Sequence, residues 1–167
     1  MFRYYKNYFY NSLTVKETKQ LKIVKFSIEK DMHGFITLHQ QDARFFDESY
    51  TYSYFRVTIG QVVDERIEYV ASKLDCKRNL VFENMLLKGD YIMLIEPFLY
   101  TSNTITFTVS SYCSSFVFFS EEEKVDKRDY DRIELLIWKD FCLKNSSLLN
   151  DKHTVKIIDT DFEMLVK

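Results

Sequence analysis

The chain has 167 residues, enough for one domain with a real core, and its 46% apolar and 29% charged content is that of a globular protein. A formal net charge of −2 argues against a dedicated nucleic-acid binder, because such a protein needs a basic surface to displace counterions. The longest apolar runs, residues 91–95 and 116–119, are too short to cross a bilayer.

Residues 1–20 are interpreted as an N-terminal arm, because their aromatic side chains follow no clean period. Aromatic residues are enriched where protein interfaces bury their centres, so we expect these side chains to bind a partner. Packing on the protein's own sheet is the alternative. The aromatic residues of the arm are Phe2, Tyr4, Tyr5, Tyr8, Phe9 and Tyr10.

From Leu21 onward the sequence has the composition of β-strands. Residues 21–28, 35–40 and 54–63 are rich in β-branched and aromatic side chains, and Gly60 interrupts the third run. A turn is expected at residues 31–34, and the polar stretch 42–49 is expected to form a loop.

Further strands are predicted at residues 66–70, 91–95 and 104–112, with shorter apolar runs at 80–85 and 116–119. Residues 88–90 (KGD) have the composition of a tight turn, and Pro97 is expected to end the strand before it because it has no amide hydrogen. Seven or eight short strands that do not alternate with helices predict an antiparallel β-sandwich.

The C-terminal part has a different pattern. Residues 121–129 form a charged run that we expect to be solvated. Apolar residues then recur at helical spacing, at Tyr130, Ile133, Ile137 and Phe141, and predict an amphipathic helix over residues 128–143 with Asp126 as its N-cap. A final strand is predicted at residues 153–158.

The segment from residue 35 to 119 resembles the third domain of calpains. The similarity begins at residues 35–44 (FITLHQQDAR), is strongest at residues 86–98 (LLKGDYIMLIEPF) and continues in residues 106–112 (TFTVSSY). The resemblance implies a C2-like antiparallel β-sandwich of about eight strands over residues 21–120, followed by a helical and strand extension over residues 121–167. No segment of the chain resembles the calpain protease core.

The residues that commonly carry catalysis are scattered. The three cysteines and three histidines show no spacing typical of a zinc site or of an activated nucleophile, and the three glycines cannot form a phosphate loop. We therefore expect no enzymatic activity, no cofactor and no small-molecule substrate. His39 is interpreted as a hydrogen-bonded residue on a strand, and the odd, widely spaced cysteines suggest reduced thiols.

Calcium is the one metal for which candidate ligands can be named. C2-like sandwiches can gather carboxylates from loops at one end, and calcium takes six to eight oxygen ligands. The candidates are Asp42, Asp47, Glu48 and Asp64. A solvated loop without calcium is the alternative.

Phe45 and Phe46 lie inside the same polar loop. Two aromatic side chains between charged neighbours are predicted to form a partner-binding patch or a membrane-inserting tip. Folding back onto the sandwich is the alternative.

Together these patterns predict a non-catalytic accessory subunit, a structural scaffold that docks into a multiprotein complex through its arm and helix. We expect partner proteins and no nucleic acid. A calcium-dependent phospholipid-binding or regulatory domain associated with a calpain-like protease is the alternative. The expected location is the cytoplasm, in a cytoskeletal or ciliary complex, with the mitochondrion as the alternative.

Overall fold

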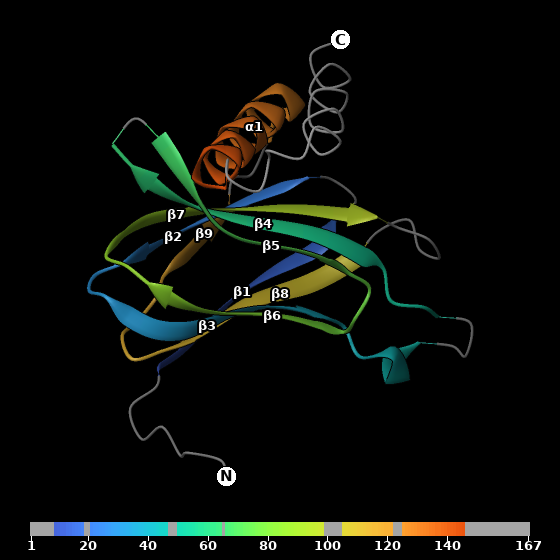
Figure 1. Ribbon diagram of the computed structural model, residues 1–167. Helices are drawn as coiled ribbons and strands as arrows, with labels where there is room; N and C mark the ends of the chain where they lie inside the picture. The colour runs from blue at the N-terminus through green and yellow to red at the C-terminus, as the bar shows by residue number, and fades with distance from the viewer. Residues whose placement is uncertain are drawn as a thin grey trace.

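Two antiparallel sheets lie face to face, and the C-terminal α-helix of the described residues packs on the outer side of one of them (Figure 1). This computed structural model describes residues 9–18, 21–46, 50–64, 66–98, 105–121 and 125–145. The β-sandwich and the C-terminal helix predicted from the sequence are both confirmed.

The first sheet has four strands and the second has five. In spatial order the four-stranded sheet contains β1 (Phe9–Thr18), β8 (Ile105–Cys113), β3 (Met32–Gln40) and β6 (Asn79–Leu86). The five-stranded sheet contains β5 (Arg66–Asp75), β4 (Tyr54–Val63), β7 (Gly89–Phe98), β2 (Lys22–Ile28) and β9 (Phe119–Glu121).

The chain changes sheet repeatedly as it builds these layers. Strands β1, β3, β6 and β8 belong to one sheet, and β2, β4, β5 and β7 belong to the other. The spatial orders 1-8-3-6 and 5-4-7-2 are those of a jelly roll, an antiparallel sandwich made of two Greek keys. The short strand β9 is added beside β2 at the edge of the second sheet.

Alternating side chains of both sheets form the core. On β4, Phe55, Val57 and Ile59 point inward and are completely or almost completely buried. The Phe55 ring meets Phe107 of β8 in the facing sheet, with ring centroids 5.2 Å apart. Aromatic contacts of this kind fill the space between the layers.

Helix α1 (Lys127–Lys144) begins at the expected N-cap, where Asp126 Oδ1 accepts a hydrogen bond of 2.7 Å from the Arg128 amide. Its apolar face buries Tyr130 and Ile137 against Ile23 and Leu94 on the outer side of the five-stranded sheet. Within the described ranges, no helix is long and apolar enough to cross a membrane.

The structure corrects the predicted N-terminal arm. Residues 9–18 form β1, a full strand paired with β8, so the sandwich begins well before residue 21. Leu13 packs against the core and Val15 is buried in it, while Tyr10 and Thr14 are exposed. This alternation of inward and outward side chains is typical of a strand. It is difficult to recognise in the sequence because many aromatic residues precede it. Phe2, Tyr4, Tyr5 and Tyr8 lie outside the described residues.

Two other boundaries differ from the prediction, and one predicted strand cannot be compared. Pro97 does not end β7, because it pairs with Phe55 and the ladder continues to Phe98. The last strand of the second sheet is residues 119–121 rather than 116–119. The strand predicted at residues 153–158 lies outside the described part of the chain.

Candidate functional site

On two edge strands of the four-stranded sheet, β1 and β6, a side chain bonds to a backbone group. On β1, the Asn11 carboxamide donates to the Val117 carbonyl at 2.6 Å and accepts from the Ser12 amide at 2.9 Å. On β6, the Val81 carbonyl accepts a hydrogen bond from the Lys73 ammonium group. A side chain bonded to an edge backbone group hinders a further strand from pairing at that position.

The edge of the five-stranded sheet at β5 is occupied by the helix. Asp140 Oδ2 of α1 accepts a hydrogen bond of 2.9 Å from the Tyr69 amide of β5. The same helix covers the outer side of this sheet. In Figure 1 the outer side of the four-stranded sheet is turned away from α1. Among the described elements, no helix covers that side.

Three rows of side chains cross all four strands on this uncovered side. We call these twelve residues the outer face. The register places Tyr10, Tyr112, Phe35 and Glu83 in one row, Ser12, Ser110, Thr37 and Val81 in the next, and Thr14, Thr108, His39 and Asn79 in the third. The outer face therefore combines one largely aromatic row with two rows rich in hydroxyl groups.

A hydrogen-bond network connects the two polar rows. His39 Nε2 lies 2.6 Å from Thr37 Oγ1 and 2.9 Å from Ser110 Oγ. His39 Nδ1 lies 2.9 Å from the Asn79 carboxamide oxygen, which can only accept, so Nδ1 carries the ring hydrogen. Both ring nitrogens have partners, which confirms the interpretation of His39 as a hydrogen-bonded residue on a strand.

The order serine, histidine, asparagine resembles the relay of a nucleophilic enzyme. Ser110, however, is 0% exposed and lies in the middle of an extended strand. The Thr37 hydroxyl lies 2.7 Å from Ser110 Oγ. It is also nearer to His39 Nε2, at 2.6 Å, than Ser110 Oγ is, at 2.9 Å. No substrate atom could reach the Ser110 hydroxyl in this arrangement, so the network acts as a rigid support for the outer face.

A cluster of exposed aromatic rings borders the outer face. We call Phe9, Phe116 and Phe118 the aromatic edge. The Phe116 ring centroid lies 6.2 Å from that of Phe9 and 4.8 Å from that of Phe118. Beside it, the rings of Tyr10 on β1 and Tyr112 on β8 are in contact, with centroids 5.0 Å apart and planes tilted by 48°. All five side chains are between 41% and 70% exposed.

The predicted patch at Phe45 and Phe46 lies at the other end of the sandwich. Phe45 is the last residue of the 3₁₀ turn η1 (Ala43–Phe45) and Phe46 follows it, beyond the C-terminal end of β3. Phe9 pairs with Cys113 of β8, which in turn pairs with Gly34 near the N-terminal end of β3. Phe46 stacks on Tyr50 with centroids 4.1 Å apart, while Phe45 is 82% exposed. The two predicted aromatic sites are therefore separate.

The structure does not bring the described calcium candidates together. Asp42 is largely buried and pairs with Arg44 at 2.7 Å and with Arg78 at 3.0 Å. Asp64 lies in the exposed turn after β4, whereas Asp42 precedes that strand. A ten-residue strand spans about 33 Å, far more than one ion can bridge.

Asp47 and Glu48, the other two calcium candidates, lie outside the described residues. Among the residues described, no group of three or more histidine, cysteine, aspartate or glutamate side chains is arranged to hold a metal.

Asp42 instead stabilises its loop, and this has a testable pH dependence. The hydrogen bond from the Arg44 side chain, with that from the Arg44 amide, lowers the pKa of Asp42 to about 2. A lowered folded-state pKa contributes stability above the ordinary value of 3.8, and this is lost as the pH falls toward 2. Asp42→Asn should therefore unfold at a lower temperature at neutral pH and show a weaker acid dependence in thermal melts. Arg44→Gln should reproduce both changes, and an unchanged acid dependence in either variant would contradict this role.

A second charged cluster lies under the helix. Arg56 Nη2 of β4 lies 2.5 Å from Glu96 Oε2 of β7 and 3.3 Å from Glu134 Oε1 of α1. Burial, the largest influence, raises the pKa of Glu134, and Arg56 opposes that shift. One arginine thus holds two carboxylates at the interface between the sheet and the helix.

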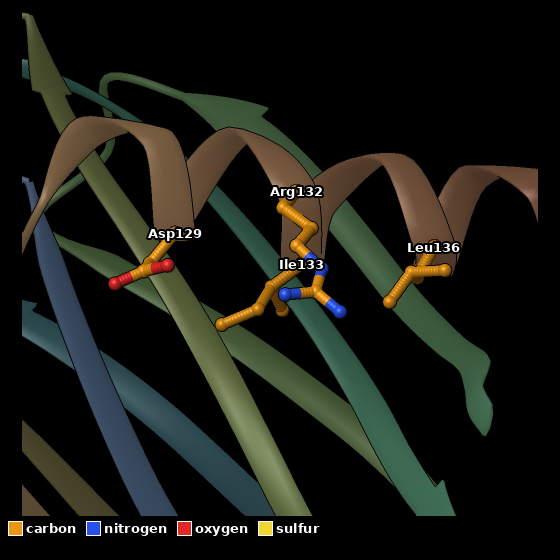
Figure 2. A pocket seen from close by; sticks show the side chains of 4 residues that line it. All are labelled: Asp129, Arg132, Ile133 and Leu136. Carbon is orange, nitrogen blue, oxygen red and sulfur yellow. The ribbon is translucent and has the colours of Figure 1, made fainter. Parts of the chain in front are cut away.

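A shallow pocket runs along α1 and is lined by Asp129, Arg132, Ile133 and Leu136 (Figure 2). All four side chains come from one side of the helix, three and four residues apart, and no residue of another element lines the pocket. Because no polar groups from a second element converge on it, we assign no binding role to this pocket.

Sequence reasoning found part of the exposed aromatic surface. It names Phe9 and Tyr10 but misses Tyr112, Phe116 and Phe118, because residues 104–112 and 116–119 are predicted simply as strands of the sandwich. Val117 is 1% exposed, whereas its neighbours Phe116 and Phe118 point outward. The alternation of one aliphatic residue with aromatic ones was the available signal.

Comparison with known proteins adds no functional assignment. No protein-family model and no curated protein matches the chain, so the resemblance to the third domain of calpains has no support there. A solved structure from Sulfurospirillum deleyianum is similar with a TM-score of 0.43 at 14% identity, covering 61% of this chain and 96% of that one. The mitogen from Yersinia pseudotuberculosis is similar with a TM-score of 0.40 at 12% identity, covering 64% of this chain and 85% of that one. Similarity at this level carries no argument about function.

Proposed function

We propose that this protein is a non-catalytic binding module that docks onto a partner protein through the aromatic edge. The observation that carries the proposal is the contact of Phe116 with both Phe9 and Phe118 while all three rings remain substantially exposed. Exposed aromatic side chains that lie together mark interaction surfaces more often than single apolar residues do.

The composition of this surface supports a protein partner. Phenylalanine supplies apolar area, and the neighbouring Tyr10 and Tyr112 add hydroxyl groups at its border. Aromatic residues are enriched at the centres of protein interfaces, and a few of them commonly supply most of the binding energy. The edge is built on β1 and on the segment between β8 and β9, and that segment is anchored by buried Val117, whose carbonyl accepts a hydrogen bond from Asn11 of β1.

We also propose a cytoplasmic setting. Cys76, Cys113 and Cys142 are all free in the structure, which supports an environment that keeps thiols reduced.

Phe118→Ser tests the docking surface. The variant removes the most exposed ring of the edge without opening the core, so the fold should be retained. Tagged protein recovered gently from its own cells should bring down stoichiometric companions, and the variant should bind them roughly 30-fold more weakly, the loss of a residue worth about 2 kcal/mol.

Phe45→Ser is the matched control, because Phe45 is at least as exposed but lies at the opposite end of the sandwich. It should retain the companions of the unmodified protein. A lone chain in the native particle, or companions that survive Phe118→Ser and are lost with Phe45→Ser, would show that the aromatic edge is not the docking surface.

A further inference from the structure

The outer face carries very little charge. Its two polar rows contain five aliphatic hydroxyl groups, one imidazole and one carboxamide, and the aromatic row adds two phenols. The hydroxyl groups of Thr37 and Ser110 are buried, so a ligand would meet those of Ser12, Thr14 and Thr108 together with His39 and Asn79. Glu83 is the one carboxylate among the twelve positions, and it lies 3.3 Å from His33. Charged residues typically make up about 25–35% of a soluble protein's surface, so this face is depleted of them. Such a face suits a ligand that is itself neutral and rich in hydrogen-bonding groups.

The polar groups are held in fixed positions. Thr14 Oγ1 lies 3.0 Å from Thr108 Oγ1 across β1 and β8. On the other side of Thr108, His39 is held by Asn79 on β6 and by hydroxyl groups on β3 and β8. A ligand that meets groups already fixed by their neighbours loses less conformational entropy on binding.

The outer face offers two kinds of contact to one extended ligand. Side chains on one face of a sheet repeat every ~6.7 Å along a strand and every ~4.8 Å across strands. Sugars present hydroxyl groups that both donate and accept hydrogen bonds, together with C–H faces that pack on aromatic rings. On the outer face Tyr10 and Tyr112, whose rings are in contact at a tilt of 48°, lie beside the polar rows, so both kinds of contact are available to one ligand.

We propose that the outer face is a binding site for a neutral oligosaccharide. Its sugar rings pack against Tyr10 and Tyr112, and its hydroxyl groups bond to the row that contains His39. The three rows contain no lysine or arginine, so they offer nothing to attract a phosphate, a sulfate or a nucleic acid. This site differs in chemistry from the aromatic edge and does not depend on the docking function proposed for it.

An immobilised glycan panel tests the proposal. It should contain neutral hexose, N-acetylhexosamine and fucose oligosaccharides beside sialylated and sulfated ones. The full chain should bind one or more neutral glycans and none of the charged set selectively. Tyr112→Ala should weaken that binding by at least about tenfold, and Thr14→Lys, which changes only an exposed hydroxyl position, should do the same.

Phe118→Ser is the matched control and should bind the same glycan with unchanged affinity, because Phe118 belongs to the aromatic edge. The proposal is overturned if no neutral glycan is bound, if only charged glycans are bound, or if both outer-face variants bind as the unmodified protein does. If the two variants lose a protein partner and no glycan is bound, the outer face is part of a protein interface. In each of these cases the docking function still depends on the separate result with Phe118→Ser.

Discussion

Gly60→Ala is expected to lower the free energy of unfolding by about 3 kcal/mol, the upper end of the cost of overpacking. A Cβ at position 60 would lie 2.5 Å from Ile67 Cγ2 and 2.9 Å from Ile137 Cγ1. Ile137 is completely buried between α1 and the sheet, so the new methyl group would force the helix outward. Trp138, the one tryptophan of the sequence, lies on that helix and should shift its fluorescence toward longer wavelength.

Gly34→Ala is the matched control. Its Cβ would lie 2.4 Å from Cys113 Sγ within the core, so it should also lower stability. It should not move the emission of Trp138 in the folded state, because Gly34 lies in the other sheet. The Ile67→Ala change should relieve part of the cost of Gly60→Ala, and a double-mutant cycle measures this coupling. Additive effects and an unshifted Trp138 emission would mean that α1 does not depend on Gly60.

The sandwich could be predicted because the side chains of a buried strand either alternate between apolar and polar or are apolar throughout. Residues 54–63 show this, with Phe55, Val57 and Ile59 facing the core, and the interruption noticed at Gly60 is a register shift between β4 and β5. The helix was predicted from its spacing and from Asp126. These patterns involve residues close together along the chain, so they can be recognised in a single sequence.

The connections between strands could not be predicted in the same way. The alternation of apolar and polar residues indicates which side of a strand is buried, but it does not indicate which other strand pairs with it. Nothing in residues 9–18 indicates that they pair with residues 105–113 rather than with a strand closer in sequence. The jelly-roll order therefore became known only from the structure.

The candidate sites likewise divide into those that local composition indicates and those that only strand pairing forms. Composition alone drew attention to Phe9 and Tyr10, because they belong to a dense aromatic run. The network around His39 includes Asn79 and Ser110, which are brought to it only by the pairing of β3 with β6 and β8. Surfaces made from several distant strands have no signature in the order of residues along the chain.

Arg56→Met is expected to lower the free energy of unfolding by about 2–3 kcal/mol at neutral pH. Removing one partner of a fully buried ion pair costs about 3–5 kcal/mol, and the figure is smaller here because the Arg56 side chain is 38% exposed. The change leaves Glu96 and Glu134 without their shared cation at the sheet–helix interface. Urea unfolding followed by Trp138 fluorescence measures the loss.

The pH dependence of this loss distinguishes an electrostatic effect from lost packing. Burial raises the pKa of Glu134, and removing Arg56, which lowers it, should raise it further. An acid whose folded-state pKa is raised favours the folded protein at low pH and destabilises it as the pH rises through that value. The deficit of Arg56→Met should therefore be smaller at about pH 5 than at about pH 8. Glu134→Gln in the same chain should recover most of the stability at the higher pH, because it removes the buried charge. An equal deficit at both pH values, without recovery by Glu134→Gln, would mean that Arg56 stabilises the interface through its aliphatic stem.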